Sequence, residues 1–203
     1  DLDKIKKGDI LVTEMTNPDM VVTMQKCDAI ITNEGGATSH ASIVSREMGI
    51  PAVVGTKTAT QILQDNMIVT VDGSAGKVYE GKVLEEKKKE ILPVVETNTK
   101  IKLILDLPDF AERAAKTNVK DVGLLRLEGI IAESGKHPMM FLAEDRIKSY
   151  IEILEKGIEK IAKHFNSIWI RTPDIRTDEY RNLQGAPKEQ ETNPMLGFHG
   201  INF

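Results

Sequence analysis

The chain has 203 residues, of which 40% are hydrophobic and 29% are charged, and its formal net charge is −4. This composition is typical of a globular protein, and scattered Lys and Arg argue against nucleic-acid or membrane partners. No apolar run is long enough to span a bilayer, and a single cysteine, Cys27, excludes an internal disulfide. We expect a cytoplasmic protein in which Cys27 is simply buried. Because the chain starts at Asp1 and stops abruptly at Phe203, we also expect a piece of a longer polypeptide.

Apolar segments separated by turn residues predict a first domain over residues 1–82. A turn or helix start is expected at residues 17–19, and Pro51 is expected to end a helix that begins near His40. A further short helix is expected at 58–63. Strands are expected at 9–13, 29–32, 52–55, 67–73 and 77–81.

Residues 83–98 predict a linker, since a run of charged side chains is followed there by Pro93. Beyond it, residues 99–203 alternate between strand and helix patterns, which predicts a parallel sheet with crossover helices. One long helix is expected over 140–164, with one apolar stripe facing a core. The stripe consists of Ile147, Ile151, Leu154, Ile158, Ile161 and Phe165. The other expected elements are a helix at 108–117 and strands at 100–105, 121–126 and 167–171.

The glycine-rich loop before His40 is the strongest candidate for chemistry in the first domain. Gly35 and Gly36 allow a tight turn and a close approach of the backbone to a ligand, and Thr38 or Ser39 can cap the following helix. His40 then lies near a helix N-terminus, where free N–H groups and the helix dipole favour an anion. On the residues alone, a structural histidine and a phosphorylated nucleophile explain His40 equally well.

Two arginines end predicted strands of the second domain. Arg126 and Arg171 each follow an apolar run, and in a barrel the carboxyl ends of the strands form the active-site face. Two guanidinium groups there could hold a phosphate bidentately. Alternatively, each arginine pairs with a nearby carboxylate, Glu128 or Asp174. Their matching positions on separate strands favour phosphate or carboxylate binding. We find no Cys/His cluster with zinc-ligand spacing and no Walker-type loop, so neither a metal site nor an ATP site is expected in this chain.

The segment from Gly35 to Gly55, with its Thr-Ser-His core, resembles the phosphohistidine loop of the phosphoenolpyruvate (PEP)-utilising enzymes. Residues 122–128 and 170–174 resemble two barrel strands of the same family, whose arginines contact the phosphate of PEP. The resemblance implies an α/β fold: a swivelling phosphohistidine domain of β/α type, followed by the first part of a TIM-type (β/α)8 barrel. It also implies that His40 carries the phosphoryl group, that Arg126 and Arg171 bind substrate, and that the phosphohistidine loop includes Gly35, Gly36, Thr38 and Ser39.

Residues 177–183 and 193–198 resemble the synthase branch of this family, although the arginine that usually follows the second motif is His199 here. A synthase makes PEP from pyruvate and ATP through a phosphohistidine. The resemblance implies ATP bound by an ATP-grasp domain of the same polypeptide, Mg²⁺ with ligands outside this chain, and a homo-oligomer. In some members of the family the threonine at position 38 is also a regulatory phosphorylation site.

Other functions remain open on the sequence. Pyruvate phosphate dikinase and enzyme I of the sugar phosphotransferase system belong to the same family and use a similar loop. Three strand–helix units cannot close an eight-stranded barrel, so a non-catalytic phosphocarrier or assembly module is a further alternative. For the same reason, the isolated chain is not expected to complete the synthase reaction.

Overall fold

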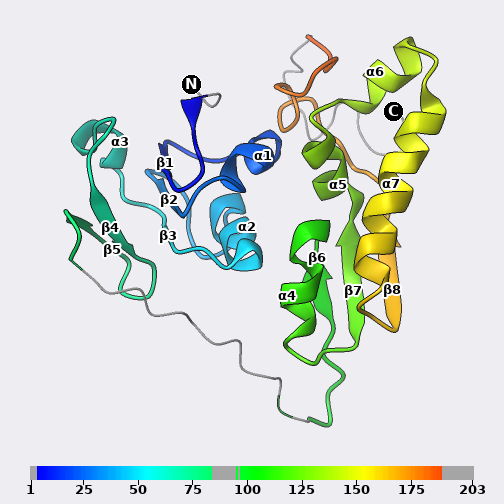
Figure 1. The fold of residues 1–203 in the computed structure, drawn as a ribbon, viewed down its shortest axis with the longest axis horizontal. Helices are drawn as coiled ribbons and strands as arrows, with labels where there is room; N and C mark the ends of the chain where they lie inside the picture. The colour runs from blue at the N-terminus through cyan, green and yellow to red at the C-terminus, as the bar shows by residue number, and fades with distance from the viewer. Residues whose placement is uncertain (1–3, 84–94, 96, 189–203) are drawn as a thin grey trace. The chain divides into compact units, whose positions relative to one another are not determined.

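The computed structural model describes residues 4–83, 95 and 97–188 (Figure 1). It divides into an N-terminal unit, residues 1–89, and a C-terminal unit, residues 90–203, each with its own parallel sheet. The linker expected at 83–98 lies for the most part outside the described residues.

Three parallel strands form the sheet of the N-terminal unit, in the order β1-β2-β3. They are β1 (Ile10–Thr13), β2 (Ala29–Thr32) and β3 (Ala52–Val53). The central strand, β2, is buried along its whole length, as expected of a run of apolar residues in a parallel sheet. After β2 comes α2 (His40–Met48), which packs on the sheet through one buried face that includes Ala41, Val44 and Met48.

The C-terminal end of α2 is made by a glycine and not by the proline that the sequence suggested. Gly49 adopts a left-handed conformation, with φ of 76°. The N–H of Ile50 donates to the carbonyl of Ser45 at 3.0 Å, and the N–H of Gly49 donates to that of Arg46 at 3.2 Å. These two bonds form a Schellman cap. The helix therefore ends before Pro51, and the prediction that Pro51 ends it was wrong.

Short elements complete the N-terminal unit. The helix start expected at residues 17–19 is confirmed. The strands predicted at 67–73 and 77–81 are also found, and they pair as an antiparallel hairpin. The turn between them is closed by Asp72, whose carboxylate accepts the N–H groups of Ser74 and Ala75 at 2.9 Å. The elements are η2 (Pro18–Met20), α1 (Val21–Met24), α3 (Ala59–Ile62), and the antiparallel strands β4 (Val69–Asp72) and β5 (Lys77–Glu80).

The C-terminal unit has a second sheet of three parallel strands, in the order β6-β7-β8. The strands are β6 (Leu103–Leu105), β7 (Asp121–Arg126) and β8 (Ser167–Arg171). A helical segment connects β6 to β7, through η3 (Pro108–Phe110) and α4 (Ala111–Ala115), and three more helices connect β7 to β8. Parallel strands joined by helical crossovers are the building units of a β/α barrel, so the predicted α/β fold class is confirmed.

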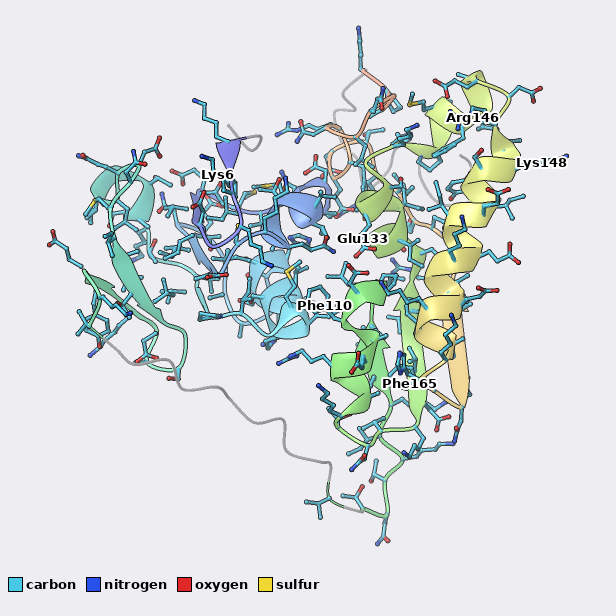
Figure 2. The ribbon with its side chains drawn as sticks, viewed as in Figure 1. Lys6, Phe110, Glu133, Arg146, Lys148 and Phe165 are labelled. Atoms are coloured by element: carbon cyan, nitrogen blue, oxygen red, sulfur yellow. The ribbon has the colours of Figure 1, made fainter. Side chains whose placement is uncertain are left out.

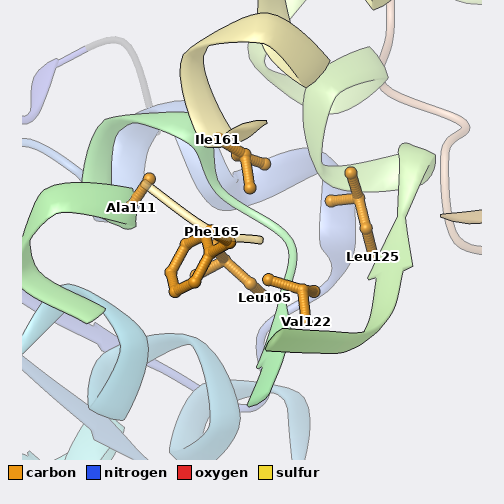
Figure 3. Close-up of a cluster of buried hydrophobic side chains, with 6 residues drawn as sticks. All are labelled: Leu105, Ala111, Val122, Leu125, Ile161 and Phe165. Carbon is orange, nitrogen blue, oxygen red and sulfur yellow. The ribbon is translucent and has the colours of Figure 1, made fainter. Parts of the chain in front are cut away.

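Helices cover one face of this second sheet, and the core lies between them and the strands. Phe165, just after the last helix, points into this core (Figures 2 and 3). On the opposite face Ile104 and Trp169 are exposed, each next to a strand residue that packs into the core. An uncovered inner face is expected for three strands of a barrel. The buried residues of the core are Leu105, Ala111, Val122, Leu125, Ile161 and Phe165.

The long helix predicted at 140–164 is in fact two helices, α6 (Pro138–Ala143) and α7 (Ile147–Ala162). Between them Asp145 adopts a positive φ of 53°, and the N–H of Arg146 donates to the carbonyl of Phe141 at 2.7 Å. This turn brings α6 against α7, and the ring centroids of Phe141 and Tyr150 lie 5.6 Å apart. The predicted stripe is therefore buried only in its second half, while Ile147 and Ile151 are exposed.

One helix of the C-terminal unit, α5 (Leu127–Ser134), was not predicted from the sequence, and it starts directly at the end of β7. Apolar and buried residues occupy most of its faces, so the sequence lacks the alternation of apolar and polar residues by which an amphipathic helix is predicted. Gly129 lies in its first turn, where a Cβ would overlap the carbonyl oxygen of Asp106. This close approach allows the helix to begin without a connecting loop.

We expect His137 to lower the stability of the C-terminal unit at acid pH. Its buried ring accepts the N–H of Met139 at 3.2 Å, and burial lowers the pKa of His137 from 6.5 to about 4. The stabilisation by the neutral ring is therefore complete above about pH 6.5 and is lost as the pH falls through 4. The loss should be on the order of 3 kcal/mol in the free energy of unfolding.

Urea unfolding followed by the emission of Trp169, the single tryptophan of the chain, measures this effect. His137→Gln should flatten the dependence between pH 7 and pH 4, because glutamine does not titrate there. His164→Gln, at an exposed histidine, controls for the substitution itself. An equally steep loss in His137→Gln would contradict the assignment.

Candidate active site

His40 is the first residue of α2, and its ring contacts a buried threonine from a neighbouring loop. Ring atom Nδ1 lies 2.8 Å from Oγ1 of Thr16. Thr16 follows β1, whereas His40 follows β2, and these strands pair in parallel from Ile10 opposite Ala29 onward. Because the carboxyl ends of paired parallel strands lie at one edge of a sheet, two residues 24 positions apart meet there.

Thr16 was not among the site residues predicted from the sequence. A weak signal was present, since Thr16 is a hydroxyl residue that closely follows the strand predicted at 9–13. The order of the strands decides whether the two loops are neighbours, and that order is known only from the structure.

The loop before His40 needs a glycine at one of its two predicted positions. Gly35 has φ of 110°, and a Cβ there would lie 2.9 Å from Oγ of Ser39. Gly36 has no atom within 4 Å of the position of a Cβ, and its φ is not positive. The tight turn therefore depends on Gly35, while Gly36 leaves open space beside the loop.

Side chains of α2 hold this loop. Ser39 occupies the N-cap position, as predicted for Thr38 or Ser39, but its hydroxyl donates to Oγ of Ser42 at 3.3 Å and does not cap the helix. The hydroxyl of Ser42 in turn donates to the carbonyl of Gly36 at 2.8 Å, and Arg46 donates to that of Ala37 at 2.8 Å. Two successive peptide groups of the loop are thus fixed by the helix that it precedes.

A polar network supports the same edge of the sheet behind the loop. Asn33, which is buried directly after β2, donates from Nδ2 to Glu14 at 2.8 Å and to Thr60 at 2.6 Å. Its Oδ1 accepts the N–H of Thr60 at 3.1 Å and the hydroxyl of Thr56 at 3.3 Å. Asn33 thereby joins the loops after β1, β2 and β3, which stabilises the edge that carries His40.

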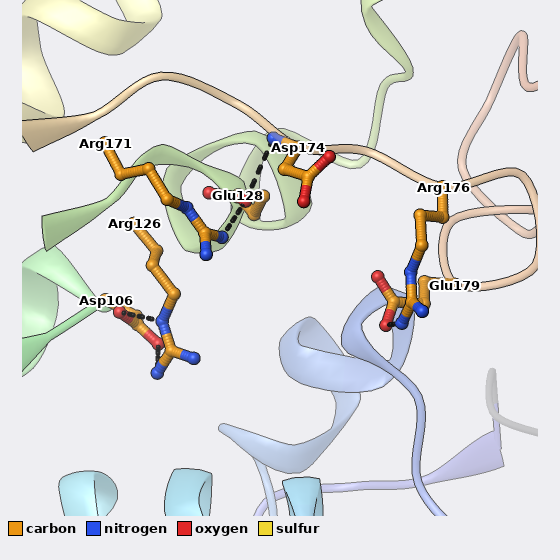
Figure 4. A network of polar contacts seen from close by, with 7 residues as sticks. All are labelled: Asp106, Arg126, Glu128, Arg171, Asp174, Arg176 and Glu179. Atoms are coloured by element: carbon orange, nitrogen blue, oxygen red, sulfur yellow. Dashed lines mark hydrogen bonds and ion pairs between the residues drawn. The ribbon is translucent and has the colours of Figure 1, made fainter. Parts of the chain in front are cut away.

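In the C-terminal unit, Arg126 and Arg171 each end a strand, as predicted, and the two strands are neighbours in the sheet. The two arginines are register partners on β7 and β8 (Figure 4). The guanidinium of Arg126 forms a bidentate pair with Asp106, which follows β6, with Nε–Oδ1 and Nη2–Oδ2 distances of 2.9 and 2.5 Å. The carboxyl ends of three successive strands thus contribute Asp106, Arg126 and Arg171.

Arg171 pairs with a different carboxylate. Its Nη2 donates to Oε1 of Glu128, and the same oxygen accepts the N–H of Asp174 at 3.0 Å (Figure 4). The sequence offers Glu128 and Asp174 as alternative partners of the arginines, and Glu128 is a partner of Arg171. Arg126 pairs with Asp106 from the end of the preceding strand, an acid that the sequence analysis did not suggest.

Burial dominates the electrostatics of this second site. It raises the pKa of Asp106 above the usual range of a carboxyl group, although the hydrogen bonds and charge of Arg126 act in the opposite direction. Burial also raises the pKa of Tyr180, and the nearby charges of Glu128 and Asp106 raise it further. The hydroxyl of Tyr180 therefore stays protonated and neutral beside the two acids.

The structure gathers the predicted site residues into one group in each unit. His40, Gly35, Gly36 and Ser39 form the first group together with an exposed Thr38, and the two arginines form the second. The motif at 193–198 and His199 lie outside the described residues. Among residues 4–83, 95 and 97–188, no three His, Cys, Asp or Glu side chains are grouped as metal ligands would be.

Cys27 is not part of either group. It is buried after α1, and its thiol donates to the carbonyl of Thr23 at 3.3 Å. Burial raises the pKa of the thiol to about 11, so the reactive thiolate is disfavoured. The prediction that Cys27 is simply a buried residue is confirmed.

Two family models match the chain over almost its whole length. The mobile domain of PEP-utilising enzymes matches residues 5–76, and the PEP-binding domain of these enzymes matches residues 82–203. The chain belongs to the PEP-utilising enzyme family. The resemblance seen in the sequence is therefore confirmed, and the two groups of residues fall in different domains of the family.

Proteins named as PEP synthases are similar to this chain along nearly all of it. A probable phosphoenolpyruvate synthase of Archaeoglobus fulgidus is 50% identical over 210 residues, which cover 99% of this chain and 28% of that protein. The phosphoenolpyruvate synthase of Pyrococcus furiosus is 49% identical over 217 residues, which cover 99% of this chain and 26% of that protein. The chain thus spans about a quarter of the length of these relatives. No helix in the described part of the chain is long and apolar enough to cross a membrane.

A matched pair of substitutions tests the backbone of the loop. We expect Gly35→Ala to reduce the local stability of α2 by about 1–3 kcal/mol, because alanine is strained at this φ and its Cβ meets Ser39. Gly36→Ala should change it by less than about 0.5 kcal/mol, since the space is open. Amide hydrogen exchange of peptides from α2 measures both values. Equal protection in the two variants would show that Gly35 is not constrained.

Proposed function

We propose that this chain provides the phosphoryl-carrying histidine and the first part of the PEP site of an enzyme that makes PEP from pyruvate and ATP. The observation that carries the proposal is the position of His40, at the first residue of α2 with Nδ1 on Thr16. Relatives about 50% identical to this chain bear the name PEP synthase, which favours this reaction over those of other members of the family.

The contact with Thr16 suggests which nitrogen reacts. A nucleophilic imidazole needs a ring nitrogen with a lone pair, and the other nitrogen then carries the proton. In the proposed mechanism Nδ1–H of His40 donates to Oγ1 of Thr16. The lone pair of Nε2 attacks the phosphorus of PEP as the bond from phosphorus to the enol oxygen breaks, and the enolate of pyruvate leaves; the reverse step forms PEP. Thr16 thereby selects the reactive tautomer and fixes the direction of the ring.

The start of α2 suits the charge of a phosphohistidine. The first amides of a helix and its dipole favour an anion, and the hydroxyl of Ser39 donates to Ser42 instead of accepting from these amides. The carbonyls of Gly36 and Ala37 accept from Ser42 and Arg46, which fixes the path of the loop that leads to these amides. A phosphoryl group on His40 would be stabilised by groups already in position.

At the second site, Arg126 and Arg171 are proposed to bind the phosphate of PEP. Guanidinium groups match phosphate oxygens in geometry and charge, and phosphoryl transfer depends mainly on positioning and charge neutralisation. The carboxylates of Asp106 and Glu128 orient the two side chains from neighbouring positions. Phosphoryl transfer between His40 and the enol of pyruvate would occur at this edge.

The remaining parts of the reaction are also proposals. ATP would be bound by an ATP-grasp region of the same polypeptide, and residues 83–98 would tether a histidine domain that visits both sites. Mg²⁺ would neutralise charge on the transferred group. The described residues offer no cluster of ligands for this ion, so its ligands are expected elsewhere in the polypeptide.

Replacing His40 tests the central proposal. The full-length natural protein that contains this sequence is incubated with ATP labelled at the β-phosphate, or with PEP labelled at its phosphate. Wild-type protein should acquire acid-labile label from both donors, whereas His40→Ala should acquire none. His164→Ala, at an exposed histidine, should label as wild type. Acid-labile label that persists in His40→Ala would refute the assignment.

The role of Thr16 is tested separately. Thr16→Val keeps the shape of the side chain but removes the hydroxyl, and it should slow labelling from both donors about tenfold, the equivalent of one lost hydrogen bond. Thr16→Ser should restore most of the rate, since it keeps the oxygen. Wild-type rates in Thr16→Val would exclude selection of the tautomer by this residue.

A further inference from the structure

Glu128 is a buried carboxylate that joins the strand ends of the arginine site to the chain beyond them. It lies in the first turn of α5, two residues after Arg126, and only 7% of its side chain is exposed. Its Oε1 accepts both Nη2 of Arg171 and, at 3.0 Å, the N–H of Asp174 (Figure 4). One oxygen therefore contacts the last residue of β8 and the loop that follows.

This contact restricts a side chain that would otherwise be mobile. The side chain of Arg171 is 45% exposed, and a long exposed arginine samples many rotamers. A charge-assisted hydrogen bond to a buried acid holds the guanidinium in one direction. The bond from Asp174 fixes the backbone three residues later, so both the side chain and the chain path after β8 are set by Glu128.

Stability alone does not explain a carboxylate in this position. Oε2 of Glu128 is buried and has no hydrogen-bond partner among the described residues, which is costly for a charged group. The pairs of Arg146 with Glu144 and of Lys160 with Asp109 lie instead on the exposed surface. A buried acid kept at an arginine, with one oxygen unsatisfied, points to a role in arranging that arginine.

We propose that Glu128 is a positioning residue, which orients Arg171 so that Arg126 and Arg171 accept the phosphate of PEP without rearrangement. This inference rests on the proposed function of the arginines. A simpler model has to be separated from it, in which Glu128 only adds negative charge beside the phosphate and weakens its binding.

Glu128→Asp separates the two models, because it keeps the charge but withdraws the carboxylate by one methylene from its two donors. In the full-length natural protein, we expect the KM for PEP to rise about fivefold, as when one long side chain must be ordered on binding. Labelling of His40 from ATP should stay within about twofold of wild type, because that step does not use Arg171. An unchanged KM for PEP would refute the positioning role.

Arg171→Ala completes a double-mutant cycle. If Glu128 acts through Arg171, then Glu128→Asp should change the KM for PEP by less than about twofold in the Arg171→Ala background. The same change in both backgrounds would overturn the proposal, because a general loss of structure or charge does not depend on Arg171. Glu144→Asp makes the same chemical change in the exposed pair with Arg146 and should leave the KM unchanged.

The two proposals fail in different ways. If Arg171→Ala leaves the KM for PEP unchanged, the assigned PEP site is wrong and the role of Glu128 falls with it. If only Glu128→Asp has no effect, the PEP site stands and the positioning role falls. Should Glu128→Asp not fold, as judged from far-UV circular dichroism, the isosteric Glu128→Gln replaces it. A positioning role predicts a rise in KM for this variant, whereas the charge model predicts a fall.

Discussion

The parallel pairing of strands places the histidine and the two arginines of this protein. In the N-terminal unit, β1 and β2 end side by side, so the loops that follow them bring Thr16 to His40. In the C-terminal unit the same pairing sets Arg126 opposite Arg171. Because side chains at the carboxyl ends of parallel strands share one edge, the ring of His40 and the pair of arginines are placed by the same rule on two different sheets.

Helices that begin directly at this edge complete both sites. α2 starts at His40 itself, and Arg126 ends β7 at the position that caps α5. The close approach of Gly129 to Asp106 allows the second of these junctions. As a result, Glu128 reaches the site from the first turn of α5, while Asp106 reaches it from the end of β6. Such acids cost stability when buried, and under the proposal above Glu128 holds the guanidinium of Arg171 in one direction.

Much of this arrangement could be predicted from local patterns. Short apolar runs bounded by turn residues indicated most of the strands, and the glycine-rich loop indicated where α2 begins. The predictions failed where local patterns are silent. α5 is apolar on most faces and shows no period, and the break at Asp145 contains neither glycine nor proline. The half of the stripe with Ile147 and Ile151 looked like a core face, yet it is exposed in the described structure.

The sequence by itself determined the α/β class and the family, and it singled out the histidine and the two arginines as candidates, because these depend on short motifs and on the period of apolar residues. Only the tertiary structure decided the partners of those residues: Thr16 for His40, Asp106 for Arg126, and Glu128 for Arg171. Each partner is either distant in sequence or belongs to an element that local patterns do not reveal. Their contacts follow from strand order and from the way helices start at strand ends, and neither is encoded in any single segment.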